Sequence, residues 1–231
     1  MLHPEWLEKY RVKLKKNLQY VKEFGFYLPL KVIVFRTRKY DPPFGGPMEN
    51  IANLLFEAGM LKRIPRSGYH FLGAGNESVA EHVHMMTFIA FVMAKLSPGI
   101  NLERLLSMCL LHDLPEARTG DLNAVQKKYV QANEKKAIDD LAGTLPFGNE
   151  MTELIAEFNR RETMEALLAS DADQIAFILD LKALADTGHK TPDKWIDHVT
   201  ARLKTDIGRN IAQSILDTEW DNWWLKDFAK E

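Results

Sequence analysis

The sequence contains a single cysteine, Cys109, among 231 residues. One thiol cannot form an intrachain disulfide or a cysteine-rich zinc cluster, and it suits a reducing compartment, so we expect a cytoplasmic protein. Long hydrophobic runs are also scarce. The chain opens with polar and charged residues where a secretory signal requires an apolar segment, and VIVF (32–35) is far too short to cross a bilayer. We therefore expect neither export nor membrane insertion.

A surplus of positive charge is missing as well, because 30 Lys and Arg face 32 Asp and Glu and give a formal net charge of −2. Binding to nucleic acid or to an anionic membrane depends on such a surplus, so neither partner is expected. The charge is unevenly distributed: residues 1–45 carry a net charge of +6 and the remainder −8. A solvated helix face explains the basic segment, and a surface for a polyanion or a partner is the alternative.

The hydrophobic content of 46% with 27% charged residues is typical of a globular chain that can bury a core. Apolar residues between Trp6 and Val21 recur every three or four positions, which predicts an amphipathic helix that ends near Gly25. Residues 27–40 have strand character, and DPPFGGP (41–47) is a turn-rich linker. The predicted architecture is all-α: a helical bundle over residues 46–231, preceded by an N-terminal helical extension over residues 1–45.

Helical periodicity continues almost unbroken from Met48. Ser78 and Glu81 have the spacing of a capping box, which predicts the start of an apolar helix that ends at SPG (97–99). The loop GAGNES (73–78) lacks the Gly-Lys-Ser/Thr ending of a phosphate-binding loop, and we interpret it as a flexible lead-in to this helix. Further helices are predicted at about 102–111, 122–143, 150–160, 162–187, 192–215 and 217–229.

Two of the seven histidines, His82 and His112, lie on strongly apolar helices, where an imidazole needs a partner to offset its lost hydration. Asp113 follows His112 directly. Imidazole nitrogen together with carboxylate oxygen suits a borderline divalent ion such as Mn, Co, Fe, Ni or Zn. His84 lies about 200° around the helix from His82, so we expect it to face elsewhere. The other histidines have polar or loop surroundings, or lie at the terminus, and are explained as solvated or structural.

A further ligand is available on the later apolar helix LLASDADQIAFIL (167–179). Its two carboxylates, Asp171 and Asp173, would be unfavourable in such surroundings if they were unpaired. We expect one of them to face the ion. A helix salt bridge or a solvated face is the alternative.

The order of these groups resembles the H…HD…D signature of the HD-domain metal-dependent phosphohydrolases. The histidine of SVAEH (78–82) precedes the His-Asp pair by 30 residues, and an Ala-Asp step follows on the late apolar helix. HDLPEARTGD (112–121) is similar to the HD-x-x-E-x-x-x-G-D segment of the 5′-deoxynucleotidase-like branch, and LKRIPR (61–66) supplies that branch's Arg-x-Pro element. The similarity covers about residues 48–190, which leaves the first 45 residues and the tail outside it.

The resemblance implies an HD-domain helical bundle that binds one divalent transition-metal ion. Its activity would be removal of the 5′-phosphate from (deoxy)nucleoside monophosphates by attack of a metal-activated water. The implied metal ligands, catalytic acids and substrate-binding arginine are, in turn, His82, His112, Asp113 and Asp173; Glu116 and Asp121; and Arg63. Which acid gives and which takes a proton stays open. In this branch the residue after the arginine can be a bulky aromatic that helps distinguish deoxyribose from ribose, and here it is Ile64. A preference for deoxyribose is therefore not implied.

Two other functions stay open. One is an HD phosphodiesterase or pyrophosphohydrolase for another nucleotide, although the lysine that follows the dyad in HD-GYP-type diesterases is absent. The other is a non-enzymatic nucleotide-sensing HD module, although no ligand or acid of the pattern is lost. The resemblance also favours a homodimer. An aromatic stripe near the C-terminus would pack on the core or on the N-terminal helix, or form a dimer contact: Trp220, Trp223, Trp224 and Phe228.

Overall fold

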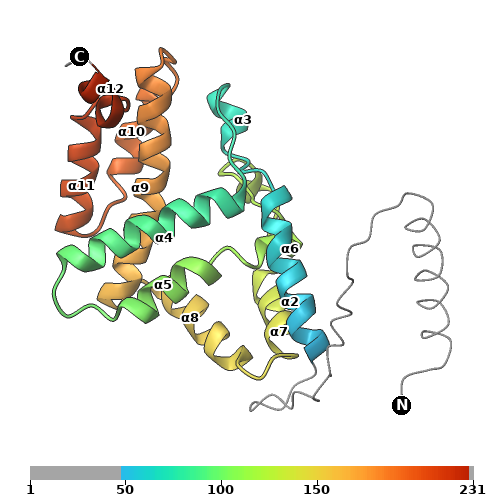
Figure 1. The fold of residues 1–231 in the computed structure, drawn as a ribbon. Coiled ribbons are helices and arrows are strands. Elements are labelled where there is room, and N and C mark those ends of the chain that lie inside the picture. The colour runs from blue at the N-terminus through green and yellow to red at the C-terminus, as the bar shows by residue number, and fades with distance from the viewer. Residues whose placement is uncertain (1–47, 229–231) are drawn as a thin grey trace, which may run out of the picture. The chain divides into compact units, whose positions relative to one another are not determined.

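The computed structural model describes residues 48–228, and the predicted extension over residues 1–45, with its helix and its strand-like stretch, lies outside the described residues. The described part is all-α, as predicted (Figure 1). Its elements are α2 (Met48–Met60), η1 (Leu61–Arg63), α3 (Tyr69–Leu72), α4 (Val79–Leu96), α5 (Leu102–Leu111), α6 (Glu116–Thr119), η2 (Gln126–Lys128), α7 (Glu134–Ala142), α8 (Gly148–Arg160), α9 (Met164–Asp186), α10 (Asp193–Thr200), α11 (Asp206–Leu216) and α12 (Asn222–Phe228).

Helix α4 begins where the sequence predicts. The Glu81 N–H donates to Ser78 Oγ (3.2 Å) and the Ser78 N–H donates to Glu81 Oε2 (2.7 Å), so the capping box satisfies two backbone donors at this helix start. Among the residues described, α4 is the one helix long and apolar enough to cross a membrane by length and composition. Met86, Ala90 and Met93 on it have no exposed surface, as expected for the central helix of a packed domain.

The core consists of two clusters that meet along α4. The larger cluster joins α4 to α5 and α9, and α8, α10 and α11 pack around them. The smaller one contains Val79 and Val83 from the first turns of α4, and it adds residues of η1, α7 and α8. Figure 1 shows α4 and α9 crossing near the centre of the domain. His82 lies on α4 between the two clusters, where it is fully buried.

The single polar helix predicted over 122–143 is wrong for its first half, where the chain forms only the short η2 before α7 begins at Glu134. The Asn123 side chain accepts the N–H groups of Val125 and Gln126, each at 3.0 Å. Such a local side-chain bond offers the backbone an alternative to the helix. Asn133 then accepts the Lys136 N–H at 3.0 Å and caps α7.

The helix predicted over 192–215 is also divided, into α10 and α11. Asp171 of α9 accepts the backbone N–H groups of Lys204 and Thr205, each at 2.8 Å, which pulls the chain out of helical geometry. Thr205 then caps α11 by accepting the Gly208 N–H at 3.0 Å. A contact between distant helices therefore sets this break.

The C-terminal aromatic residues do not all pack on the core. Trp223 and Phe228 are mostly exposed, at 79% and 70%, and Trp224 contacts Phe228 edge to face with ring centroids 6.3 Å apart. The Trp220 N–H donates to Asp186 at the end of α9, which ties down the start of this segment. The alternatives of packing on the N-terminal helix or in a dimer are not tested by residues 48–228.

Candidate metal centre and active site

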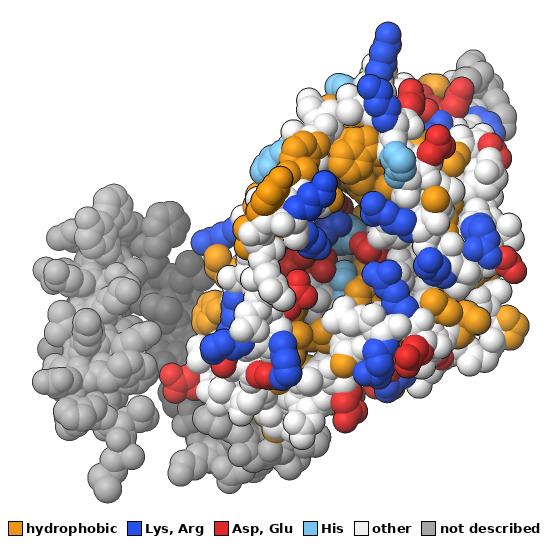
Figure 2. All heavy atoms as spheres, turned by 180° about the vertical axis from the view of Figure 1, so that it is seen from behind, with side chains coloured by type: hydrophobic (Ala, Val, Ile, Leu, Met, Phe, Trp, Pro, Cys, Tyr) orange, Lys and Arg blue, Asp and Glu red, His pale blue; other side chains and the backbone are white. Residues whose placement is uncertain are grey.

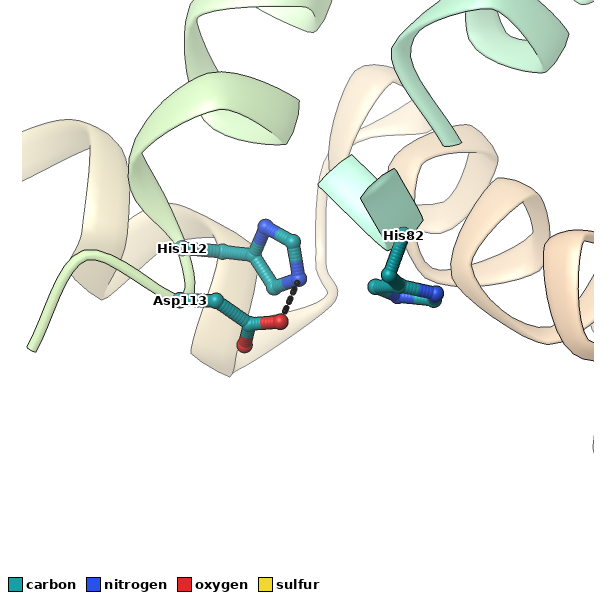
Figure 3. Close-up of side chains that lie close together, drawn as sticks. All are labelled: His82, His112 and Asp113. Atoms are coloured by element: carbon teal, nitrogen blue, oxygen red, sulfur yellow. Dashed lines mark ion pairs between the residues drawn. The ribbon is translucent and has the colours of Figure 1, made fainter. Parts of the chain in front are cut away.

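Three helices bring their polar residues to one place. His82 comes from the first turn of α4, and His112 ends α5 as its C-cap residue. Pro115 has no N–H to donate back into α5, so the helix stops and Asp113 lies in the turn that follows. One ligand atom from each of His82, His112 and Asp113 lies within 4.8 Å of the others (Figure 3).

The orientation of His112 is fixed by the main chain. Its Nδ1 lies 2.9 Å from the carbonyl oxygen of Cys109. A carbonyl can only accept, so Nδ1 carries the hydrogen and Nε2 presents its lone pair to the site. Nε2 lies 3.1 Å from Asp113 Oδ2, yet it is buried without hydrogen-bond geometry to any described residue. Two electron-rich atoms this close require a proton or a metal cation beside them.

A proton competes for this place. Burial lowers the pKa of His112, but the charge and close contact of Asp113, together with the charge of Asp173, outweigh burial and raise this pKa to about 9. Burial raises the pKa of Asp113, and the neighbouring His112 and Arg66 hold it below its ordinary value. A divalent ion bound by these two groups would displace that proton, because metal ligands bind in their deprotonated form.

The second pair joins α4 to α9. His82 Nε2 lies 2.9 Å from Asp173 Oδ1, and Gln174 Nε2 donates to the other Asp173 oxygen at 2.7 Å. Burial raises the pKa of Asp173, but the hydrogen bond and charge of His82, together with the charges of Arg66 and His112, outweigh burial and hold this pKa far below its ordinary value. His82 is thus fixed opposite the His112–Asp113 pair, and their ring centroids are 6.3 Å apart.

These residues fit a divalent metal ion. Neighbouring ligands of an ion with bonds of about 2.1 Å lie roughly 3 Å apart, the separation found in both the His82–Asp173 and the His112–Asp113 pair. Four carboxylates, from Asp113, Glu116, Asp121 and Asp173, gather around one guanidinium of the described chain, so the site lacks positive charge. Imidazole and carboxylate donors favour ions of the Mn, Fe, Co, Ni and Zn group.

The two aspartates of α9 have separate roles. Asp171 is fully buried and faces away from this cluster, where it accepts the N–H groups of Lys204 and Thr205 and the Thr205 hydroxyl at 2.7 Å. Three donors satisfy its charge without a metal. Asp173, two residues on, is the one that faces His82.

Glu116 and Asp121 lie beside the cluster on the segment after α5. Glu116 Oε2 is buried and finds no hydrogen-bond partner within residues 48–228. Burial, followed by the charges of Asp113 and Asp121, raises the pKa of Glu116 to about 8. Gly120 has a φ of 74°, a conformation that favours glycine, and the turn leads to Asp121, which accepts the Ser67 N–H at 2.7 Å.

The arginine that reaches the site is Arg66 and not Arg63. Its guanidinium lies 3.5 Å from Asp113, 4.0 Å from Asp121 and 4.0 Å from Asp173. Arg63 is exposed on η1 and pairs with none of these carboxylates. Ile64, between them, packs in the smaller core cluster.

Sequence analysis missed Arg66 although LKRIPR (61–66) contains both arginines. The matched pattern selects the first one. Nothing local in the sequence distinguishes the two arginines, because Arg66 is placed by the antiparallel pairing of Pro65 with Ser78, which forms only in the fold.

Other predictions about single residues are met. His84 is exposed on the opposite side of α4 from the cluster. Arg118, which lies between the two acids in sequence, pairs with Glu57 (Nη2 to Oε2, 2.9 Å) and approaches Asp140 at 3.9 Å. Arg118 therefore forms structural ion pairs on the α2 and α7 side.

The site opens to the surface. Figure 2 shows a hollow in one face of the domain, with acidic and histidine side chains inside it and Lys and Arg side chains around its rim. Asp113, Asp121 and Asp173 keep 14%, 11% and 19% of their side-chain surface exposed, so solvent and a small ligand can reach them. A separate groove of about 740 Å³ between α9, α11 and α12 is mostly apolar and contains no histidine.

The fold and the site define a helical-bundle protein with a mixed histidine and aspartate centre that fits a divalent metal ion. The chain belongs to the HD domain family, whose model matches residues 58–215. Among curated proteins it is similar to the 5′-deoxynucleotidase HDDC2 of Danio rerio, with 30% identity over 138 residues that cover 57% of this chain and 68% of that protein. HDDC2 of Homo sapiens is 28% identical over 152 residues, which cover 63% and 74%.

Solved structures give the same fold. A conserved hypothetical protein from Pyrococcus furiosus aligns with a TM-score of 0.61 and 30% identity, over 72% of this chain and 99% of that one. A predicted metal-dependent phosphohydrolase from Magnetospirillum magnetotacticum aligns with a TM-score of 0.55 and 24% identity, over 74% and 93%, which supports the fold alone.

Proposed function

We propose that this HD-domain protein is a metal-dependent phosphohydrolase that removes the 5′-phosphate from (deoxy)nucleoside monophosphates. The convergence of His82, the His112–Asp113 pair and Asp173 carries the proposal. The Arg66 guanidinium lies beside them, as does Glu116 Oε2, which has no hydrogen-bond partner in the described chain. The names of the curated relatives support the substrate class.

The two histidines with Asp113 and Asp173 would hold the metal, which supplies Lewis-acid activation of a water molecule and of a phosphoryl oxygen. A cation also balances the excess of carboxylates that a phosphate dianion would otherwise meet. Without this positive charge, the site would repel its own substrate.

Arg66 binds the phosphate. Its contacts with three aspartates are long, between 3.5 and 4.0 Å, so no carboxylate holds the guanidinium in a close two-pronged pair. Its N–H donors can therefore turn to phosphoryl oxygens, whose geometry a guanidinium matches better than a lysine ammonium does. The same group stabilises the charge that spreads over these oxygens in the transition state.

Glu116 transfers the proton, and Asp121 positions the segment that carries Arg66. A pKa of about 8 lets Glu116 exchange a proton near neutral pH, so it takes the proton of the attacking water and passes it to the leaving 5′-oxygen. The water oxygen bonds to phosphorus as the bond to O5′ breaks, which releases nucleoside and inorganic phosphate. Asp121, bound to the Ser67 N–H, holds the segment that carries Arg66.

The test is a panel of nucleoside monophosphates assayed with Mn²⁺, Co²⁺, Fe²⁺, Ni²⁺ and Zn²⁺. His112→Ala and Asp113→Ala should abolish phosphate release while the chain stays folded, and His84→Ala, which changes an exposed histidine of α4, should behave as the wild type. Full activity in either of the first two variants would refute the proposal.

The same panel separates the alternatives. Turnover of cyclic dinucleotides or diphosphates, with none of monophosphates, would indicate a phosphodiesterase or pyrophosphohydrolase. Tight nucleotide binding without turnover under any metal would indicate a sensor.

A further inference from the structure

We propose that Glu77 is a positioning residue for the metal centre: it accepts a hydrogen bond from His82 Nδ1 and so fixes the tautomer and the ring orientation that turn Nε2 toward the metal. The inference rests on the metal site of the proposed function. It gives a specific place to a loop, GAGNES (73–78), that the sequence presents only as a lead-in to α4.

The main chain holds Glu77 in position. The Arg66 N–H donates to the Glu77 carbonyl oxygen at 2.8 Å, and the Val79 N–H donates to the Ile64 carbonyl oxygen at 2.9 Å. Pro65 and Ser78 form the antiparallel bridge between these bonds. The segment before α4 is therefore paired with the segment that carries Arg66.

The loop is also pressed against the aromatic ring of Tyr69. Gly75 has a φ of 76°, and a Cβ at this position would lie 3.0 Å from the Tyr69 ring and 3.2 Å from Leu184. Only glycine fits this conformation and this space without strain. The loop that carries Glu77 is thus packed in place.

The two nitrogens of His82 face two different carboxylates. Nε2 lies 2.9 Å from Asp173 Oδ1, on the side of the other metal-ligand candidates, and Nδ1 lies 3.7 Å from Glu77 Oε2. The His82 side chain is 1% exposed and that of Glu77 is 9% exposed, and Nδ1 is buried with no hydrogen-bond partner in the described chain. A buried N–H left without an acceptor is unfavourable, because it has given up its hydrogen bond to water.

Glu77 is placed to be that acceptor. The distance of 3.7 Å exceeds a normal N–H···O contact by about 0.7 Å, so the proposed hydrogen bond requires the Glu77 carboxyl group to move toward Nδ1 by this amount. Once Nδ1–H is bound, Nε2 is the nitrogen with the free lone pair. This arrangement, in which a carboxylate binds the far nitrogen of a metal-binding histidine, fixes the ring and increases its basicity.

The Glu77 carboxylate in turn needs His82 as its hydrogen-bond donor. The Tyr69 hydroxyl lies 3.5 Å from Glu77 Oε2, but it makes a much closer contact with Asp180. A hydroxyl has one hydrogen to donate, and the nearer Asp180 takes it. The Nδ1–H of His82 is then the donor that the buried side of the Glu77 carboxylate can reach.

The experiment measures metal affinity and not turnover. The full chain is freed of metal with a chelator and titrated with Mn²⁺ and with Co²⁺ by calorimetry, and the Co²⁺ absorption spectrum reports the ligand field. Glu77→Ala should weaken metal binding by about 10–100-fold and alter the Co²⁺ spectrum. Glu77→Gln, which keeps an acceptor oxygen but no charge, should lie between Glu77→Ala and the wild type.

Tyr69→Phe is the matched control. It removes the other polar contact of Glu77 without touching His82, so metal affinity should stay within about twofold of the wild type. If Glu77 served only to anchor the loop through Tyr69, both substitutions would weaken binding alike. That result, or an unchanged metal affinity in Glu77→Ala, would overturn the inference.

The outcome is separable from that for the proposed function. A Glu77 effect on metal affinity in a protein that hydrolyses no nucleotide would remove the proposed activity and keep the positioning role. Normal nucleotide hydrolysis, with metal binding unaffected by the Glu77 substitutions, would keep the proposed activity and remove the positioning role. The melting temperature of each metal-free variant shows whether it is folded, and Glu77→Gln keeps the test valid if Glu77→Ala does not fold.

Discussion

Replacing Arg66 by alanine should reduce kcat/KM for a nucleoside monophosphate much more than replacing Arg63. The side chain of Arg66 is 20% exposed and lies within 4.0 Å of three site aspartates, whereas Arg63 points to solvent from η1. Burial lowers the pKa of Arg66, but Asp113, Asp173 and Asp121 outweigh it, so the net shift is upward and the guanidinium is charged throughout the working pH range.

The size of the effect follows from the bonds that are lost. A hydrogen bond between charged groups contributes about 1.5–3 kcal/mol, so two such bonds to a phosphate contribute roughly 3–6 kcal/mol. One factor of ten in rate corresponds to about 1.4 kcal/mol, which gives a loss of roughly 10²–10⁴ in kcat/KM for Arg66→Ala. Arg66→Lys keeps the charge but not the two-pronged geometry, so its loss should be roughly 10–100-fold.

The assay is phosphate release at saturating metal, with metal content measured on the same samples. Removing a positive charge from a site that binds a cation should leave metal affinity equal or tighter, so the loss should appear in turnover and substrate binding. Arg63→Ala should stay within about twofold of the wild type, as expected for an exposed side chain. The assignment would be refuted by Arg66→Ala keeping a tenth of the wild-type kcat/KM, or by Arg63→Ala falling as far.

Four further predictions concern the carboxylates and the charge of the site. Glu116→Gln should keep its metal but lose about 10²–10⁴ in kcat, and a metal-free variant would instead make Glu116 a ligand. Asp171→Ala should lower the free energy of unfolding by roughly 3–5 kcal/mol, measured by denaturant unfolding, because three donors, two of them buried, lose their acceptor. Its metal affinity should be unchanged. Asp173→Asn should show the opposite pattern, with weakened metal binding and little loss of stability. The metal-free protein should lose stability as the pH rises from about 5 to 9. In the folded state the pKa of Glu116 is about 8 and that of His112 about 9, above their ordinary values of 4.5 and 6.5. The native state therefore holds more protons than the unfolded state in this range, and raising the pH favours unfolding. Thermal unfolding across this range measures the trend, and an increase in melting temperature would contradict it.

Much of the fold could be predicted because its signals are local. The capping box at Ser78 and Glu81 and the caps at Asn101 and Thr163 join neighbours in the chain, so α4, α5 and α9 begin where the sequence indicates. The predictions of single helices over 122–143 and 192–215 were wrong for two different reasons. The first is interrupted by a local hydrogen bond to the Asn123 side chain, a bond typical of asparagine in turns. The second is interrupted by a contact from Asp171 on another helix.

The residue types of the site can be read from the sequence: the His-Asp pair at the end of an apolar helix, a histidine on an earlier helix and an aspartate on a later one. The choice between near neighbours came only from the tertiary structure, which turns Asp173 toward His82 and Asp171 toward Thr205, and which brings Arg66 and not Arg63 to the aspartates. Both choices depend on the packing of α9 and of residues 64–66 against distant segments. Residue spacing along one helix or loop specifies which side chains share a face, but the neighbours that this face meets are set by contacts between residues far apart in the chain.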